Sequence, residues 1–320
     1  MSVNRIRLPR IPLMVALVVS SILTHSHAKA NNSYTALKET ELLQKYIELS
    51  GQTDPGRIQL MQTLSPLERS YLWRVHLGLY LARNSTLSKD QQSLVVEALE
   101  LVGPKLFNPP DPKDPGGRIT LERVEQLRQR GLQLFSRSEA AEIFSAVGGA
   151  QDGEALRKYN ELSTLSKGDR KVSFSLMSAE NKASLWRIHF GLNLARHPEW
   201  TEHQRSIVLE ALTMVTPQLY KTPKDDNWTS LVDQPVRLLI QKALIVFTQE
   251  EGAALFAELG FTEQSKLSHA PTTRGCACAQ DSDWCNYQCI SSGCTVLTWG
   301  CGTFGIYACN GRCHVPPPQD

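Results

Sequence analysis

Most of this chain of 320 residues lacks cysteine, basic stripes and recognisable catalytic motifs. Residues 1–275 contain no cysteine, so disulfides or thiolate metal sites are confined to the segment beyond them. No stripe of Lys and Arg is present, which argues against nucleic acid or an anionic membrane as the main partner. No nucleophile–base pair, phosphate-binding loop or G-x-S-x-G turn is recognisable, so we expect neither catalysis nor a cofactor.

The composition is that of a globular protein. With 21% charged and 41% hydrophobic residues, the chain is neither collagen-like, a coiled-coil rod nor a disordered tail. Its length suits roughly two domains of ordinary size. The net charge is +2, but four positive charges and no acidic residue lie in the first 30 residues, so the remainder is mildly acidic.

The first 30 residues predict a secretory signal peptide. Three arginines precede a short apolar stretch, Ile11–Leu23, and a small-x-small site follows at Ala28-Lys29-Ala30. The apolar stretch is short for a membrane span, although an uncleaved anchor is the alternative. We therefore expect cleavage between Ala30 and Asn31 and a mature chain that is secreted, either extracellular or periplasmic.

All the cysteines lie in one C-terminal segment, residues 275–320. They are Cys276, Cys278, Cys285, Cys289, Cys294, Cys301, Cys309 and Cys313. An even number at this density in an exported chain predicts four disulfides, whose pairing the sequence leaves open. Cys276 and Cys278 are too close in the chain to pair with each other without strain. The alternative, a zinc site, would favour C-x2-C pairs, which are missing, so we expect no metal.

The cysteine-rich segment also contains many aromatic residues. They are Trp284, Tyr287, Trp299, Phe304 and Tyr307. So small a module cannot bury all of them, so we expect several to form an exposed patch. Such a patch has two interpretations: a contact surface for a receptor or lipid, or simply the consequence of a small interior.

Three stretches of the segment resemble a known family. Gly275-Cys-Ala-Cys278, Asp283-Trp284-Cys285 and Cys301-Gly-Thr-Phe-Gly-Ile-Tyr-Ala-Cys309 occur in this order. The segment resembles the fulvocin C-related bacteriocins, a group of bacterial proteins related to a small eight-cysteine bacteriocin of myxobacteria. The resemblance covers about the last 40 residues and implies an antibacterial peptide with four disulfides. It implies nothing about the preceding part of the chain.

A polar segment joins the cysteine-rich module to the rest of the chain. Residues 263–274 contain proline and few apolar residues, which is typical of an exposed linker that proteases cut. A cut between Arg274 and Gly275 by a trypsin-like protease would release the module at the start that the resemblance implies.

Residues 31–262 predict a tandem duplication of an all-α unit, with copies at 31–150 and 151–262. Residues 43–107 and 156–220 align without a gap at an offset of 113, and both contain the pattern Leu-Trp-Arg-x-His. Apolar residues recur at helical spacing, and no segment alternates as a strand would. Capping-box sequences begin a helix in each copy, at Ser88–Gln91 and Thr201–Gln204.

One predicted helix in each copy places polar and aromatic side chains on one face. They are Trp73, His76, Tyr80 and Arg83 in the first copy, and Trp186, His189, Asn193 and Arg196 in the second. With Glu97 and Glu210, the two histidines are residue types that could hold a metal ion between the copies, but the H-E-x-x-H or E-x-x-H arrangement that would make this specific is missing, so we expect none. The plainer alternative, which we expect, is a core tryptophan stacked on an arginine, with a histidine that donates to a backbone carbonyl or a glutamate.

Two functions from different classes follow from these patterns. The first is a bacteriocin-like precursor: the helical region masks, carries or helps to fold the module, a processing protease releases it, and the product acts on a target-cell surface component or envelope, protein or lipid. The second is a secreted or periplasmic binding or adhesion protein that is never processed. Extensive contact between the helical region and the module would favour the second. An enzyme with a disulfide cap is the least expected.

Overall fold

The computed structural model describes residues 39–108, 115–144, 147–221, 227–260, 276–281, 284, 288–291 and 293–313. The predicted signal peptide with Ala30 and Asn31, the predicted linker with Arg274 and Gly275, and the residues Tyr287 and Cys285 lie outside these ranges. Those predictions therefore remain predictions.

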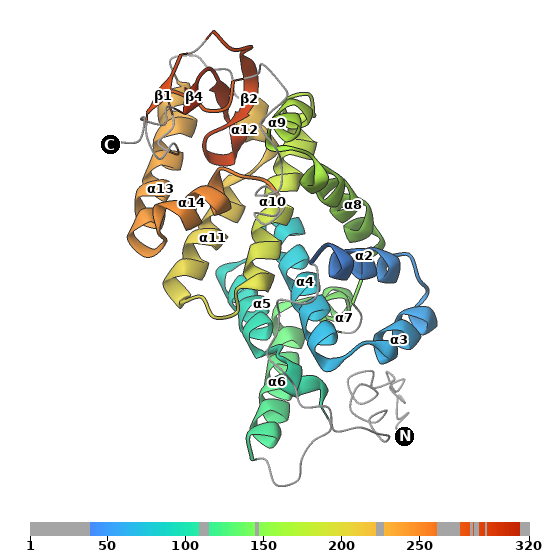
Figure 1. Ribbon diagram of the computed structural model, residues 1–320. Coiled ribbons are helices and arrows are strands. Elements are labelled where there is room, and N and C mark those ends of the chain that lie inside the picture. The colour runs from blue at the N-terminus through green and yellow to red at the C-terminus, as the bar shows by residue number, and fades with distance from the viewer. Residues whose placement is uncertain are drawn as a thin grey trace, which may run out of the picture.

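The described chain is mostly helical and ends in a cysteine-rich module, as the sequence predicts (Figure 1). The first half contains α2 (Glu39–Ser50), α3 (Asp54–Thr63), α4 (Pro66–Arg83), α5 (Lys89–Leu101), the 3-10 turn η1 (Pro104–Phe107), α6 (Pro115–Leu134) and α7 (Arg137–Phe144). The second half contains α8 (Ala150–Thr164), α9 (Lys167–Ser175), α10 (Ala179–Arg196), α11 (Glu202–Met214), α12 (Pro217–Lys221), the π-helical turn η2 (Thr229–Asp233), α13 (Gln234–Val246) and α14 (Gln249–Phe256). None of the described helices combines the length and the apolar character that crossing a membrane requires.

The two halves pack against each other through the corresponding helices α4 and α10, which cross at the centre of the molecule (Figure 1). Gly78 and Gly191 are each the thirteenth residue of their helix, and they meet at this crossing. A Cβ added to either glycine would overlap the carbonyl oxygen of the other. The absence of side chains here therefore lets two helix backbones approach closely.

Capping residues set where corresponding helices begin. Ser88 and Thr201 each accept from the backbone N–H three residues on, and Gln91 and Gln204 complete the two predicted capping boxes. The side-chain amides of Gln91 and Gln204 also donate to corresponding backbone carbonyl oxygens, those of Leu134 (Nε2 to O, 2.9 Å) and Val246 (Nε2 to O, 3.2 Å). These contacts agree with the alignment of the two halves, whose origin by duplication remains an interpretation of the sequence.

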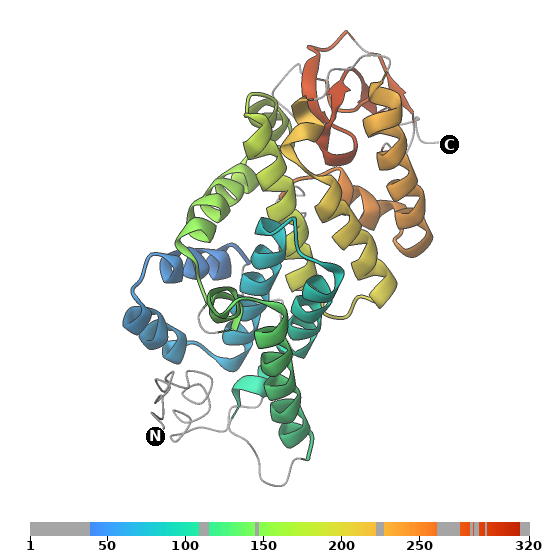
Figure 2. The ribbon, with the colours of Figure 1, turned by 180° about the vertical axis from the view of Figure 1, so that it is seen from behind.

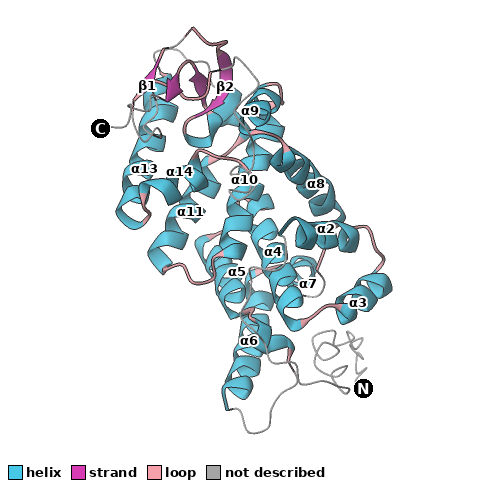
Figure 3. Cartoon of the chain, viewed as in Figure 1, coloured by secondary structure: helices cyan, strands magenta, loops and turns pink. Residues whose placement is uncertain are grey.

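The module lies at the end of the molecule formed by the second half (Figure 3). Its short strands are β1 (Cys289–Ile290), β2 (Leu297–Cys301), β3 (Tyr307–Cys309) and β4 (Arg312–Cys313), with a 3-10 turn, η3 (Thr303–Gly305). Strands β1 and β4 pair antiparallel, as do β2 and β3. So little regular structure leaves much of the module to be held by crosslinks and by its neighbours.

Among the residues that the structure describes, three disulfides cross the module. They join Cys276 to Cys294, Cys278 to Cys289 and Cys301 to Cys309. As expected, Cys276 and Cys278 each reach a more distant partner and not each other. Disulfides persist in oxidising compartments, so these bonds indicate a protein that works outside the cytosol.

Candidate functional site

The aromatic residues of the module pack against the second half. Phe304 lies at the centre of this contact and is 0% exposed. Its ring lies 5.8, 5.6 and 6.4 Å, between centroids, from those of Trp186, Phe190 and Phe256. Aromatic pairs at such distances and inclined angles stabilise a contact beyond the area that they bury. The side chain of Phe304 is thus part of the core of the second half.

The backbone of η3 bends sharply to present Phe304. Gly302 and Gly305 have φ angles of 66° and 63°, and Phe304 itself has φ of 54°. This left-handed region is open to glycine but unfavourable for a residue with a Cβ. A strained residue persists where the surrounding structure holds it. Here the buried ring holds it, together with a hydrogen bond of 2.9 Å from the Tyr220 hydroxyl to the Phe304 carbonyl oxygen.

A buried carboxylate anchors a second aromatic residue of the module. The Tyr307 hydroxyl donates to Asp233 Oδ1 at 2.6 Å, and the Tyr307 ring meets Trp228 edge-on at 5.8 Å. The other oxygen of Asp233 accepts from Arg237 Nε at 2.8 Å. Arg237 also donates to the Asp281 carbonyl oxygen of the module at 2.9 Å. One carboxylate and one guanidinium therefore connect η2 and α13 to two separate points of the module.

Two lysines of the second half complete the contact. Lys182 Nζ lies 5.3 Å from the centroid of the Trp299 ring, a distance that allows a cation–π interaction. Lys171 donates to the Ala277 carbonyl oxygen. Burial, together with the nearby positive charge of Lys167, lowers the pKa of Lys171 to about 7.

The prediction of an exposed aromatic patch was wrong for two of its members. Phe304 and Tyr307 are 0% and 4% exposed. Trp284 and Trp299 are half-buried and pack against the same core. The module cannot bury these rings by itself, as expected, but the second half supplies the missing apolar surface. These four residues, here called the aromatic face, pack against the helical region of the same chain.

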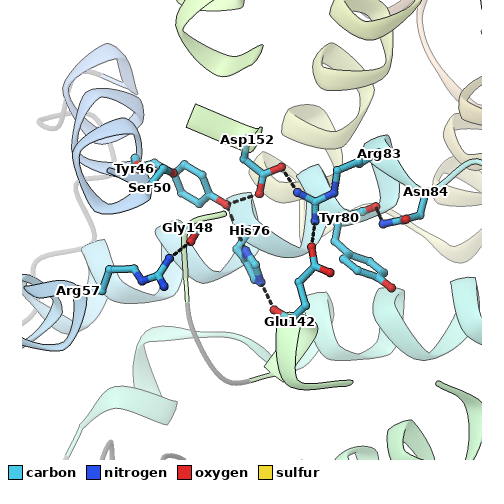
Figure 4. A network of polar contacts seen from close by, with 10 residues as sticks. All are labelled: Tyr46, Ser50, Arg57, His76, Tyr80, Arg83, Asn84, Glu142, Gly148 and Asp152. Carbon is cyan, nitrogen blue, oxygen red and sulfur yellow. Dashed lines mark hydrogen bonds and ion pairs between the residues drawn. The ribbon is translucent and has the colours of Figure 1, made fainter. Parts of the chain in front are cut away.

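The second candidate site, the polar face of the first half, is a buried network (Figure 4). His76 Nε2 donates to the Glu142 carbonyl oxygen at 2.9 Å. The Tyr46 hydroxyl lies 3.1 Å from both His76 Nδ1 and Asp152 Oδ2. Arg83 forms ion pairs with Asp152 and Glu142. The network joins α2, α4, α7 and α8, and each of these polar groups has a partner within it.

The second half contains a corresponding network, in which the carboxylate that pairs with the arginine comes from the first half. The Tyr159 hydroxyl lies 2.8 Å from His189 Nδ1, and His189 Nε2 donates to the Leu255 carbonyl oxygen at 3.1 Å. Arg196 forms an ion pair with Glu39, from α2 of the first half. In the first network Asp152 comes from α8 of the second half, and the two helices lie side by side (Figure 2). Each half thus completes the network of the other.

The suggested metal site between the halves receives no geometric support. Glu97 forms an ion pair with Arg130 and Glu210 with Lys242 at the surface, whereas the histidines lie in the networks above. In the ranges that the structure describes, no three His, Cys, Asp or Glu side chains are grouped to hold a metal ion.

The alternative interpretation, a core histidine bonded to a backbone carbonyl, is confirmed, but the expected partner of the arginine is wrong. Arg83 lies over the ring of Tyr80, with Cζ 5.7 Å from its centroid. Trp73 is ten residues earlier on the same helix, a rise of about 15 Å, which is too far for stacking. Trp73 instead meets His76 edge-on at 5.7 Å.

Burial of the two histidines predicts that acid destabilises the helical region. Burial lowers the pKa of His189 from 6.5 to about 3 and also lowers that of His76. At acidic pH the histidines of the unfolded chain therefore bind protons that the folded chain does not bind. The free energy of unfolding consequently has its full value above pH 6.5 and decreases as the pH falls. Between pH 6.5 and 4.5 we expect the free energy of unfolding to fall by up to about 1.4 kcal/mol per pH unit through His189, with a further contribution of the same sign from His76.

Urea unfolding at several pH values measures this slope. His189→Gln keeps a side chain that can hydrogen-bond but does not titrate, so its slope is expected to be shallower than that of the unmodified chain. His203→Gln, on the exposed face of α11, is the matched control and is expected to leave the slope unchanged. Equal slopes in all three proteins would contradict this account of the histidines.

The geometry therefore separates the two candidates. The polar networks are internal and hold the halves together, whereas the aromatic face of the module is where the chain brings its two unlike parts into contact. No family model, curated protein or solved structure matches the chain.

Proposed function

We propose that this chain is an exported binding protein that works unprocessed, with the cysteine-rich module docked on the second half as a structural domain. The observation that carries the proposal is the burial of Phe304 between Trp186, Phe190 and Phe256. A module that is released by proteolysis needs little contact with the helical region. This module instead contributes the Phe304 ring to the core of the second half.

The strength of the contact supports the same conclusion. Fully burying one large apolar side chain is worth about 1.5–3 kcal/mol relative to leaving it exposed. Phe304 and Tyr307 are both buried, and hydrogen bonds from Tyr220, Tyr307 and Arg237 satisfy polar groups within the same contact. A single cut in residues 263–274 would therefore leave the module bound.

Export is the second part of the proposal. The disulfides suit an oxidising compartment, and the predicted signal peptide supplies a route to it, either to the cell exterior or to the periplasm. Binding is favoured over catalysis because the polar clusters among the described residues link helices of the two halves to one another. The partner that we propose is a component of a cell surface or envelope.

Intact mass of the protein recovered from culture medium or periplasm tests the proposal. We expect one species that begins at Asn31 and retains the module, and that gains one hydrogen for each of its eight cysteines on reduction. Recovery of the module alone, beginning near Gly275, would show that the chain is processed and would overturn the proposal.

A bacteriocin-like precursor is the second candidate, and the aromatic face favours it in one respect. Its apolar residues are covered in the intact chain and would be exposed after release, as a masked toxin requires. The resemblance to the fulvocin C-related bacteriocins points the same way. Growth inhibition of related strains by the isolated module, with no inhibition by the intact chain, would establish this function in place of the first.

A further inference from the structure

An open groove lies on the second half between α8, α9 and α10, away from the aromatic face. Its cavity volume is about 470 Å³, which is in the range of small-ligand pockets. Its apolar walls include Ala155, Leu162, Met177 and Leu185, and polar side chains line it elsewhere. None of its lining residues takes part in the networks or the module contact described above.

The first half shows what fills the corresponding place there. The sixth residue of α4 is Tyr71, which is 3% exposed and donates from its hydroxyl to Glu39 Oε1 at 2.7 Å. The sixth residue of α10 is Ser184, which is exposed and lines the groove. The second half thus lacks a buried tyrosine ring that the first half contains.

A second difference between the two halves lies at the same groove. The third residue of α4, Glu68, completes a capping box and forms an ion pair with Lys45 of α2. The third residue of α10 is Asn181, and Lys158, which aligns with Lys45, pairs instead with Glu154 within its own helix at 3.0 Å. The ion pair that spans α2 and α4 in the first half therefore has no counterpart between α8 and α10.

We propose that this groove binds a tyrosine side chain of a partner polypeptide, which takes the place that Tyr71 fills in the first half. This inference rests on the proposed function only in that the chain is a binding protein. The apolar walls would receive the ring, and Gln151, which lines the groove beside Asp152, offers an amide oxygen to the phenolic hydroxyl. Leu176, next to Met177, is 82% exposed and extends the apolar surface for the flanking residues of the peptide.

The test is a titration of the full mature chain, labelled at its methionine methyl groups, with short peptides observed by NMR. The probes are Gly-Gly-Tyr-Gly-Gly and, for comparison, Gly-Gly-Ala-Gly-Gly. We expect the tyrosine peptide to shift the Met177 resonance in a saturable way and to leave those of Met61 and Met214, which lie outside the groove, in place. The alanine peptide is expected to shift none of them.

Ser184→Tyr is the decisive variant because it restores the residue of the first half. We expect at least a tenfold loss of affinity for the tyrosine peptide and a melting temperature no lower than that of the unmodified chain. Ser206→Tyr, on the exposed surface of α11, is the matched control and should bind as before. A response to the alanine peptide equal to that to the tyrosine peptide, no response at all, or unchanged affinity in Ser184→Tyr would overturn the inference. Retention of the module is measured separately by mass, so the failure of one proposal is distinguishable from the failure of the other.

Discussion

Replacing Phe304 with alanine is expected to lower the free energy of unfolding by about 3–5 kcal/mol, the usual loss when a buried aromatic ring is deleted from a core. The loss should be large because Phe304 is 0% exposed and has three aromatic neighbours that cannot easily close the cavity. The substitution also leaves a residue with a Cβ in the left-handed conformation, without the ring that holds it there.

Urea unfolding followed by tryptophan fluorescence measures the effect, because Trp186 lies beside the deleted ring. Val296→Ala is the matched control: it truncates a module side chain that is 60% exposed and should change stability by no more than about 0.5 kcal/mol. A Phe304→Ala protein within about 1 kcal/mol of the unmodified chain would contradict the placement of this ring in a well-packed core.

Replacing Gly78 with leucine is the second substitution with a large expected effect. Even a Cβ at this position overlaps the carbonyl oxygen of Gly191, so a leucine forces α4 and α10 apart along their crossing. Overpacking a core typically costs about 1–3 kcal/mol, and more where backbone must move. Since backbone atoms lie on both sides of this contact, we expect a loss of about 3 kcal/mol or more, or failure to accumulate soluble protein.

Two comparisons keep this prediction specific. Gly191→Leu should cause a similar loss, because it makes the same overlap from the opposite helix. Gly103→Ala is the control, since a Cβ there meets nothing within 4 Å and its φ of −123° suits any residue. A Gly78→Leu protein with unchanged thermal stability would show that the helices do not cross at these glycines.

Local patterns in the sequence predict the all-α character of residues 31–262 and the position of some of its helices. Helical spacing identifies the long buried helices, and Ser88 and Thr201 mark the starts of α5 and α11, because both signals depend only on residues close in the chain. The confinement of cysteine to the last segment likewise separates the module from the helical region. The disulfide pairing could not be predicted, because it depends on how the module folds: the β2–β3 pairing, for example, brings Cys301 and Cys309 together.

The contact between the parts could not be predicted from either part alone. Composition shows that the module is too small to bury Phe304 and Tyr307, but it does not show that Trp186 and Phe256 lie where those rings can pack. The groove was missed for a related reason. The exchange of Tyr71 for Ser184 is visible in the alignment of the halves, but only the structure shows that Tyr71 is buried and that Ser184 lines an open space.

The most direct test of the account is to cut the chain between the second half and the module without denaturing it. A specific protease site is placed in residues 263–274, cleavage is verified by mass, and the cut protein is passed over a size-exclusion column. We expect both pieces to elute together at the position of the uncut chain, because the aromatic face and the Tyr307–Asp233 hydrogen bond hold them. Elution of the module by itself under native conditions would contradict the claim that it is a structural part of the helical protein.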